Sequence, residues 1–168
     1  MPISMYQASV PVFTKMLTNL SVILEKTAAY AQDKKIDEAV FLEARLFPDM
    51  LPLRRQVQIA SDQAKGAARL AGLEPPAFED KEQTIAELIT RINRTIEFLA
   101  TLKPAQVDGS EGREITRIIR GQSKTFTGIN FLLQFAMPNF YFHVTTAFAI
   151  LRHNGLDIGK TDFLGPLG

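Results

Sequence analysis

The chain has 168 residues, of which 46% are hydrophobic and 22% charged, a composition that predicts one globular domain over residues 1–168 and excludes disordered and fibrous proteins. The absence of cysteine excludes disulfides, thiolate nucleophiles and cysteine-based metal centres. The 19 basic and 18 acidic residues nearly cancel, so we expect neither nucleic acid nor an anionic membrane as a partner. The first residues lack a basic segment followed by an apolar run, which favours a cytoplasmic location.

The N-terminal part of the chain predicts one long amphipathic helix followed by a connector. From Ser9 to Ala31, apolar residues recur at the three- and four-residue spacing of a buried helix face. Ser9 is the predicted N-cap with Pro11 in the first turn, and a start near Ser4 with a bend at the proline is the alternative. The charged and irregular stretch 33–47 is interpreted as a connector, with room for one helical turn.

Two further amphipathic helices are predicted in the middle of the chain. The second begins at Asp49, an expected N-cap, and ends at Gly72. The third follows a capping box formed by Asp80 and Gln83 and ends before Pro104. The charged residues expected on its exposed face are Glu87, Arg91 and Arg94.

The C-terminal part predicts a β-hairpin and a fourth helix. β-branched residues on both sides of Gly121 favour a short hairpin between residues 107 and 128. The fourth helix covers 129–152 and ends at Asn154 and Gly155. The 23 residues from Ile129 to Leu151 contain no charged side chain. A helix of this length is long enough to cross about 30 Å of hydrocarbon. Because this segment carries several polar side chains, we expect a buried bundle helix and no membrane partner.

The polar residues that two of these helices carry beside their apolar faces form the candidate site. Asn139 and His143 lie four residues apart and therefore share one face of the fourth helix. Asp49 and Gln56 border the apolar face of the second helix. If these faces meet, the four side chains form a polar cluster, which serves either a chemical function or as a hydrogen-bonded core network that sets the helix register. Neutral amides are poor ligands for zinc or nickel.

Three arginines follow the third helix at short intervals, namely Arg113, Arg117 and Arg120. Because the net charge is close to zero, we interpret them as a solvated surface that tolerates anions and not as a nucleic-acid interface.

A resemblance to a known family is carried by three segments, SMYQASVPVF, FPDMLPLRRQVQIASDQAKGAARLAGLEPP and PNFYFHVTTAFAILRHNGLDIGKTDFLG. Together they resemble a bacterial family of domains of unknown function that is similar to the DinB/YfiT-like superfamily. The resemblance implies a mainly all-α fold, a four-helix bundle with a small β-hairpin between the third and fourth helices. Several members of that superfamily are dimeric, divalent-metal-dependent enzymes, including thiol transferases, so the resemblance also implies a homodimer.

The same resemblance implies where a metal would be held. In metal-binding members, a histidine of the second helix and a His-x-x-x-His pair of the fourth helix hold the ion. Counting back from Gly155 places Asn139 and His143 at the pair, and the position on the second helix falls at Gln56, or at Gln58 in a shifted register. The chain therefore keeps one of the three expected histidines.

Two functions follow as hypotheses. The first is a non-catalytic or degenerate-site member that binds a small ligand or a partner, with Asn139 and Gln56 as ligand-binding residues. The alternative is a divalent-metal-dependent hydrolase or thiol transferase that holds nickel or zinc weakly at His143. In that enzyme His143 and Asp49 are the candidate catalytic residues.

Overall fold

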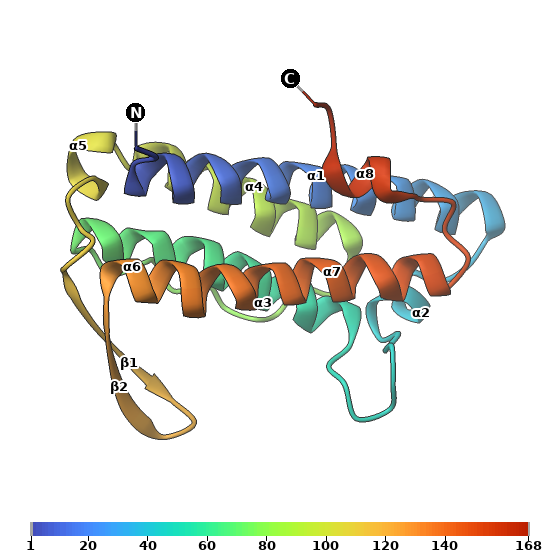
Figure 1. Cartoon of the computed structure of the whole chain (residues 1–168). Coiled ribbons are helices and arrows are strands. Elements are labelled where there is room, and N and C mark those ends of the chain that lie inside the picture. The colour runs from blue at the N-terminus through green and yellow to red at the C-terminus, as the bar shows by residue number, and fades with distance from the viewer. Residues whose placement is uncertain (1, 168) are drawn as a thin grey trace.

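A computed structural model describes residues 2–167 and confirms a bundle of four long helical elements (Figure 1). These elements are α1 (Met5–Lys34), α3 (Leu53–Lys65) continued by the 3-10 helix η1 (Gly66–Ala71), α4 (Ile85–Thr101) and α7 (Met137–His153). The most extensive helix contacts are those of α3 with α7 and of α1 with α4. The second and fourth long helices of the chain are therefore direct neighbours, as a site between them requires.

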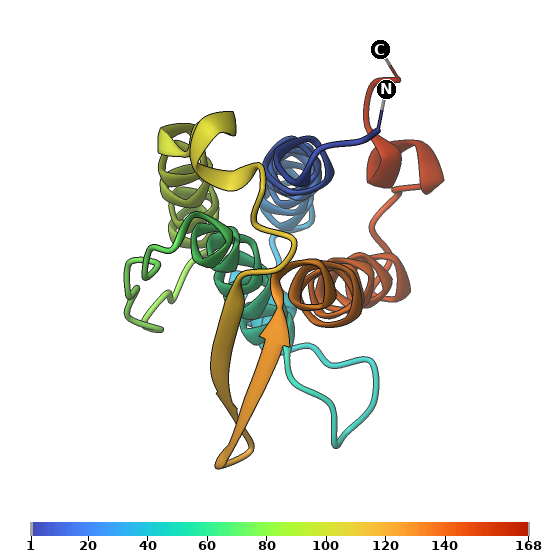
Figure 2. The same ribbon diagram turned by 60° about the vertical axis from the view of Figure 1, so that its left-hand side comes forward.

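Short elements connect the long helices. They are α2 (Glu38–Leu42), α5 (Pro104–Val107), the strands β1 (Glu114–Ile119) and β2 (Gln122–Thr127), α6 (Gly128–Asn130), the π-helical segment η2 (Phe131–Ala136) and α8 (Lys160–Leu164). The hairpin projects away from the bundle (Figure 2), and at its root β2 contacts α6. Arg120 and Gly121 both have positive φ angles, as a two-residue turn with the twist of a hairpin demands.

The start of α1 differs from the first prediction and agrees with the alternative. Ser4 is the N-cap, and it forms a reciprocal capping box with Gln7. Ser9 lies one turn inside the helix, where its hydroxyl donates to the carbonyl oxygen of Met5 at 2.6 Å. Pro11 lies exposed within α1. The helix therefore begins at Ser4, whose capping box with Gln7 forms two hydrogen bonds.

Two other predicted caps were wrong. The N-cap of α3 is Pro52, whereas Asp49 lies exposed in the preceding loop. The capping box of α4 is formed by Thr84 and Glu87 and not by Asp80 with its partner three residues later. Asp80 instead forms ion pairs with two arginines of the bundle, an interaction that has no signature in the local sequence. The predicted end of the second helix is confirmed, because Gly72 has the left-handed conformation that ends η1.

The fourth helix supplies the bundle with a buried apolar face. Phe140 is fully buried and its ring lies edge-on to that of Phe13, with 4.9 Å between the ring centroids. Further along α7 the buried residues are Val144, Thr146, Ala147, Ile150 and Leu151. Pro138, which has no backbone N–H to donate, lies in the first turn of α7 directly after the π-helical segment. Among the described helices, none combines the length and the apolar character needed to span a bilayer.

Candidate functional site

The contact between α3 and α7 contains a hydrogen-bonded pair formed by Gln56 and His143. The side-chain oxygen Oε1 of Gln56 lies 2.7 Å from Nδ1 of the His143 ring. Gln56 is 1% exposed, and its Nε2 donates to the carbonyl oxygen of Leu51 at 2.8 Å. The amide therefore joins the imidazole on α7 to the loop that precedes α3. This pair shows that the face of α3 that carries Gln56 meets the face of α7 that carries His143.

The hydrogen bonds of Gln56 determine which ring nitrogen of His143 carries the proton. Because the Gln56 amide nitrogen already donates to Leu51, its oxygen is the atom that faces the ring. An amide oxygen only accepts, so Nδ1 of His143 must be the protonated nitrogen in the neutral ring. Nε2 then carries a lone pair, which is available to accept a hydrogen bond or to bind a ligand.

The half-buried position of His143 also determines its charge. Burial lowers the pKa of His143 below its ordinary value of 6.5, because the charged imidazolium loses solvation in the helix interface. The ring is therefore neutral at pH 7. A neutral imidazole fixed at one nitrogen by a buried amide can act as an oriented hydrogen-bond acceptor or as a base.

We expect this pKa shift to make the stability of the protein depend on pH. Below pH 6.5 the unfolded chain protonates at His143 before the folded chain does. The free energy of unfolding should therefore decrease as pH falls from 6.5 toward the lower pKa of the folded state. Urea unfolding measured across this pH range should show a smaller decrease for His143→Gln than for the wild type. Identical pH profiles of the two proteins would contradict the assignment of this effect to His143.

The other residues predicted for the cluster do not join the pair. The Nδ2 of Asn139 donates to the carbonyl oxygen of Phe135 at 2.7 Å, within its own helix. Asp49 is exposed, and no hydrogen bond or ion pair joins it to His143 within residues 2–167. Gln58, the alternative position on the second helix, donates to Glu82 at 2.7 Å. Of the four predicted side chains, the fold brings two into direct contact.

This donor set does not fit a tightly held divalent ion. Within residues 2–167 no group of three or more histidine, cysteine, aspartate or glutamate side chains is placed to hold a metal. The oxygen of Gln56 is the side-chain atom nearest to His143 that could bind a metal, but it already accepts the hydrogen bond from the ring. Zinc and nickel sites in proteins require several imidazole, thiolate or carboxylate ligands. One imidazole and the occupied amide do not supply them.

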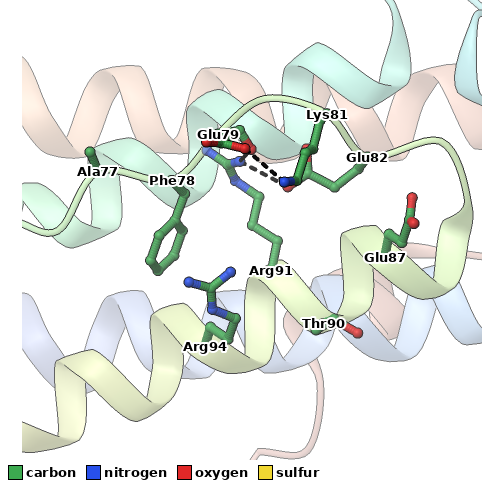
Figure 3. Close-up of a pocket in the computed structure, with 9 residues that line it drawn as sticks. All are labelled: Ala77, Phe78, Glu79, Lys81, Glu82, Glu87, Thr90, Arg91 and Arg94. Carbon is green, nitrogen blue, oxygen red and sulfur yellow. Dashed lines mark hydrogen bonds and ion pairs between the residues drawn. The ribbon is translucent and has the colours of Figure 1, made fainter.

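A second polar site lies beneath the loop 72–84, on the side of α3 that faces away from α7 (Figure 2). The Arg91 guanidinium of α4 is 1% exposed and donates to Glu82 at 2.9 Å and to Asp62 at 3.0 Å. It also forms an ion pair with Asp80 at 3.0 Å. A pocket of about 460 Å³ adjoins this cluster. Figure 3 shows Phe78 beside Arg94 among the side chains that line the pocket.

The sequence prediction for Arg91 was wrong, because it placed this residue on an exposed helix face. Burial alone lowers the pKa of Arg91, but the hydrogen bond to Glu82 and the charges of Asp62 and Asp80 outweigh it and raise the pKa. The signal that could have indicated this arrangement is the concentration of acidic residues in the loop that precedes α4, FEDKE. A polar helix face that is exposed to solvent would not need acidic residues in a neighbouring loop to balance its charge.

Comparisons with known proteins agree with the observed bundle. Residues 5–164 match a family described as a domain of unknown function, DUF1993. No curated protein matches the chain significantly. The chain is similar to the crystal structure of a DinB family member from Shewanella denitrificans, with 44% sequence identity and a TM-score of 0.90, over 96% of this chain and 92% of that one. The chain therefore belongs to the DUF1993 family, which lies within the DinB-like helical bundle proteins.

Proposed function

We propose that the protein is a non-catalytic DinB-family member whose site between α3 and α7 binds a small protic ligand without a metal. The observation that carries this proposal is the 2.7 Å hydrogen bond between Gln56 and Nδ1 of His143. This bond occupies the oxygen of the Gln56 amide and orients the His143 ring. Among residues 2–167, no further side chains are placed to complete a metal site. The pair is suited to hold a ligand that donates a hydrogen bond.

The surroundings of the ring support a ligand with an apolar part. Phe142 lies edge-on to His143, with 5.2 Å between the ring centroids, and is 56% exposed. The site is therefore open to the surface beside an aromatic ring. A ligand whose N–H or O–H group donates to Nε2 can place its apolar part against Phe142. Because the ring is neutral at pH 7, the ligand needs no negative charge.

Nitrogen-detected NMR of the histidine rings tests the proposed hydrogen-bond state. In the wild type we expect His143 to show a proton on Nδ1 and an unprotonated Nε2 at pH 7. A mixture of small phenols and primary amides should shift the ring signals of His143. The matched control is His153, an exposed histidine at the end of the same helix, whose signals should not shift. The variants His143→Gln and His153→Gln assign the two sets of signals.

A metal titration separates this proposal from the hydrolase or thiol transferase. Isothermal titration with nickel and zinc should detect no one-to-one binding at His143. Such binding would be recognised because His143→Gln would abolish it and His153→Gln would retain it. A stoichiometric ion with that behaviour would contradict the metal-free site and favour the enzyme. Unshifted His143 signals in the ligand mixture would contradict the proposed ligand class.

A further inference from the structure

Basic side chains gather on one face of the hairpin without acidic partners. In the antiparallel register, Arg117 of β1 lies directly opposite Lys124 of β2. Residues directly opposite one another project from the same face of a sheet, and like charges in that position destabilise the pair. No ion pair or hydrogen bond of either side chain to an acidic residue occurs within residues 2–167. An arrangement with this cost points to a negatively charged group that these residues bind.

Two arginines from neighbouring segments extend this basic face at the root of the hairpin. Arg69 of η1 and Arg113, just before β1, line a pocket of about 200 Å³. Ile115, which also lines this pocket, lies two residues before Arg117 on β1, so both residues project from the same face of the strand. Burial, and after it the charge of Arg117, lower the pKa of Arg69. Arg69 is paired with Glu74 at 2.7 Å. Arg113 has no such partner within residues 2–167.

Gly72 allows Arg113 to lie close to the wall of this pocket. A Cβ atom at Gly72 would be 2.5 Å from Nη1 of Arg113, nearer than two such atoms can approach. The φ angle of 74° at this glycine also disfavours any other residue. The same glycine that ends η1 therefore leaves space for the guanidinium beside the backbone.

We propose that Arg69, Arg113, Arg117 and Lys124 form a binding site for the phosphate group of a small phosphorylated ligand. Arg69 and Arg113 line the pocket together with Glu74 and Glu114. Arg117 and Lys124 lie on the adjoining face of the hairpin and add two positive charges that no acidic side chain pairs within residues 2–167. Guanidinium groups bind phosphate through paired hydrogen bonds, and a phosphate group offers three oxygens to several arginines at once. The pocket is smaller than the roughly 300–1,000 Å³ of sites that enclose whole organic ligands, so it fits the phosphate group alone.

Titration with pyrophosphate at low ionic strength tests this site in the full chain. The wild type should bind pyrophosphate, and the affinity should decrease as chloride is added. Arg117→Gln should weaken binding by about tenfold, the effect of losing one charge-assisted hydrogen bond. Arg120→Gln is the matched control, because it removes the same charge from the exposed turn of the same hairpin and should change the affinity less than twofold.

The melting temperatures of the variants show whether a loss of binding comes from the lost charge or from unfolding. Because Arg117→Gln removes a like-charge pair, it should leave the melting temperature unchanged or raise it. Lys124→Gln should behave in the same way and provides a second variant. Equal pyrophosphate affinities of the wild type and of both these variants would overturn the site, as would the absence of binding by the wild type.

A second arm identifies the source of the phosphate. Glucose 6-phosphate and a single-stranded oligonucleotide of ten nucleotides both present phosphate groups, on a small molecule and on a polymer respectively. Binding of the sugar phosphate that Arg117→Gln weakens supports the small-ligand assignment. Tighter binding of the oligonucleotide than of the sugar phosphate, with the same loss in Arg117→Gln, would overturn it in favour of a nucleic-acid partner.

Discussion

Arg91→Ala should lower the free energy of unfolding by about 3–5 kcal/mol, the cost of removing one partner from a buried ion-pair cluster. Without the guanidinium, the carboxylates of Asp62, Asp80 and Glu82 lose the cation that they share. The carbonyl oxygen of Glu79 also loses its donor at 3.1 Å. We expect the loop 72–84 to detach from α4 as a result. Guanidinium denaturation followed by far-UV circular dichroism measures the change in stability.

The control for this variant is Arg94→Ala, three residues further along α4. Arg94 is exposed and its guanidinium lies 4.3 Å from the centre of the Phe78 ring. Such an exposed cation–π contact contributes about 0.5–1 kcal/mol, so the loss should be of that size. A loss for Arg91→Ala no larger than that for Arg94→Ala would show that the buried cluster does not hold the loop in place.

Phe140→Ala should lower the free energy of unfolding by about 3–5 kcal/mol because it leaves a cavity at the centre of the bundle. The ring of Phe140, on α7, is fully buried and lies edge-on to Phe13 of α1 and to Tyr141 of α7. These neighbours belong to two helices, so they cannot close the space without shifting a helix. Urea denaturation of the purified variant gives the change directly.

The matched control for this cavity is Phe142→Ala, on the same helix two residues later. Phe142 is 56% exposed, so its removal should change the free energy of unfolding by less than about 0.5 kcal/mol. A comparable loss of stability in both variants would contradict the assignment of Phe140 to the core. Because Phe142 borders His143, this control should still weaken binding of an apolar ligand at that site.

The sequence alone determined the four helices and the hairpin, whereas the contact between the second and fourth helices was only a condition of the predicted site. Apolar periodicity arises from interactions between residues that are three and four positions apart, and such local patterns are visible in a sequence. Gly72 was recognised as a helix end for the same reason, since a left-handed residue there requires a glycine. The family resemblance placed His143 in one site with Gln56, or with Gln58 in a shifted register, and the fold joins His143 to Gln56.

Helix starts and side-chain partners were decided only by tertiary structure. Several residues near each helix start are suitable caps, and packing selects among them, so Thr84 caps α4 while Asp80 binds Arg91. Asn139 has the face expected for the site, but a carbonyl oxygen of its own helix competes for its amide. The burial of Arg91 depends on a loop that folds back over α4. A helical pattern states which residues share a face, whereas the neighbour that covers the face comes from a distant part of the chain.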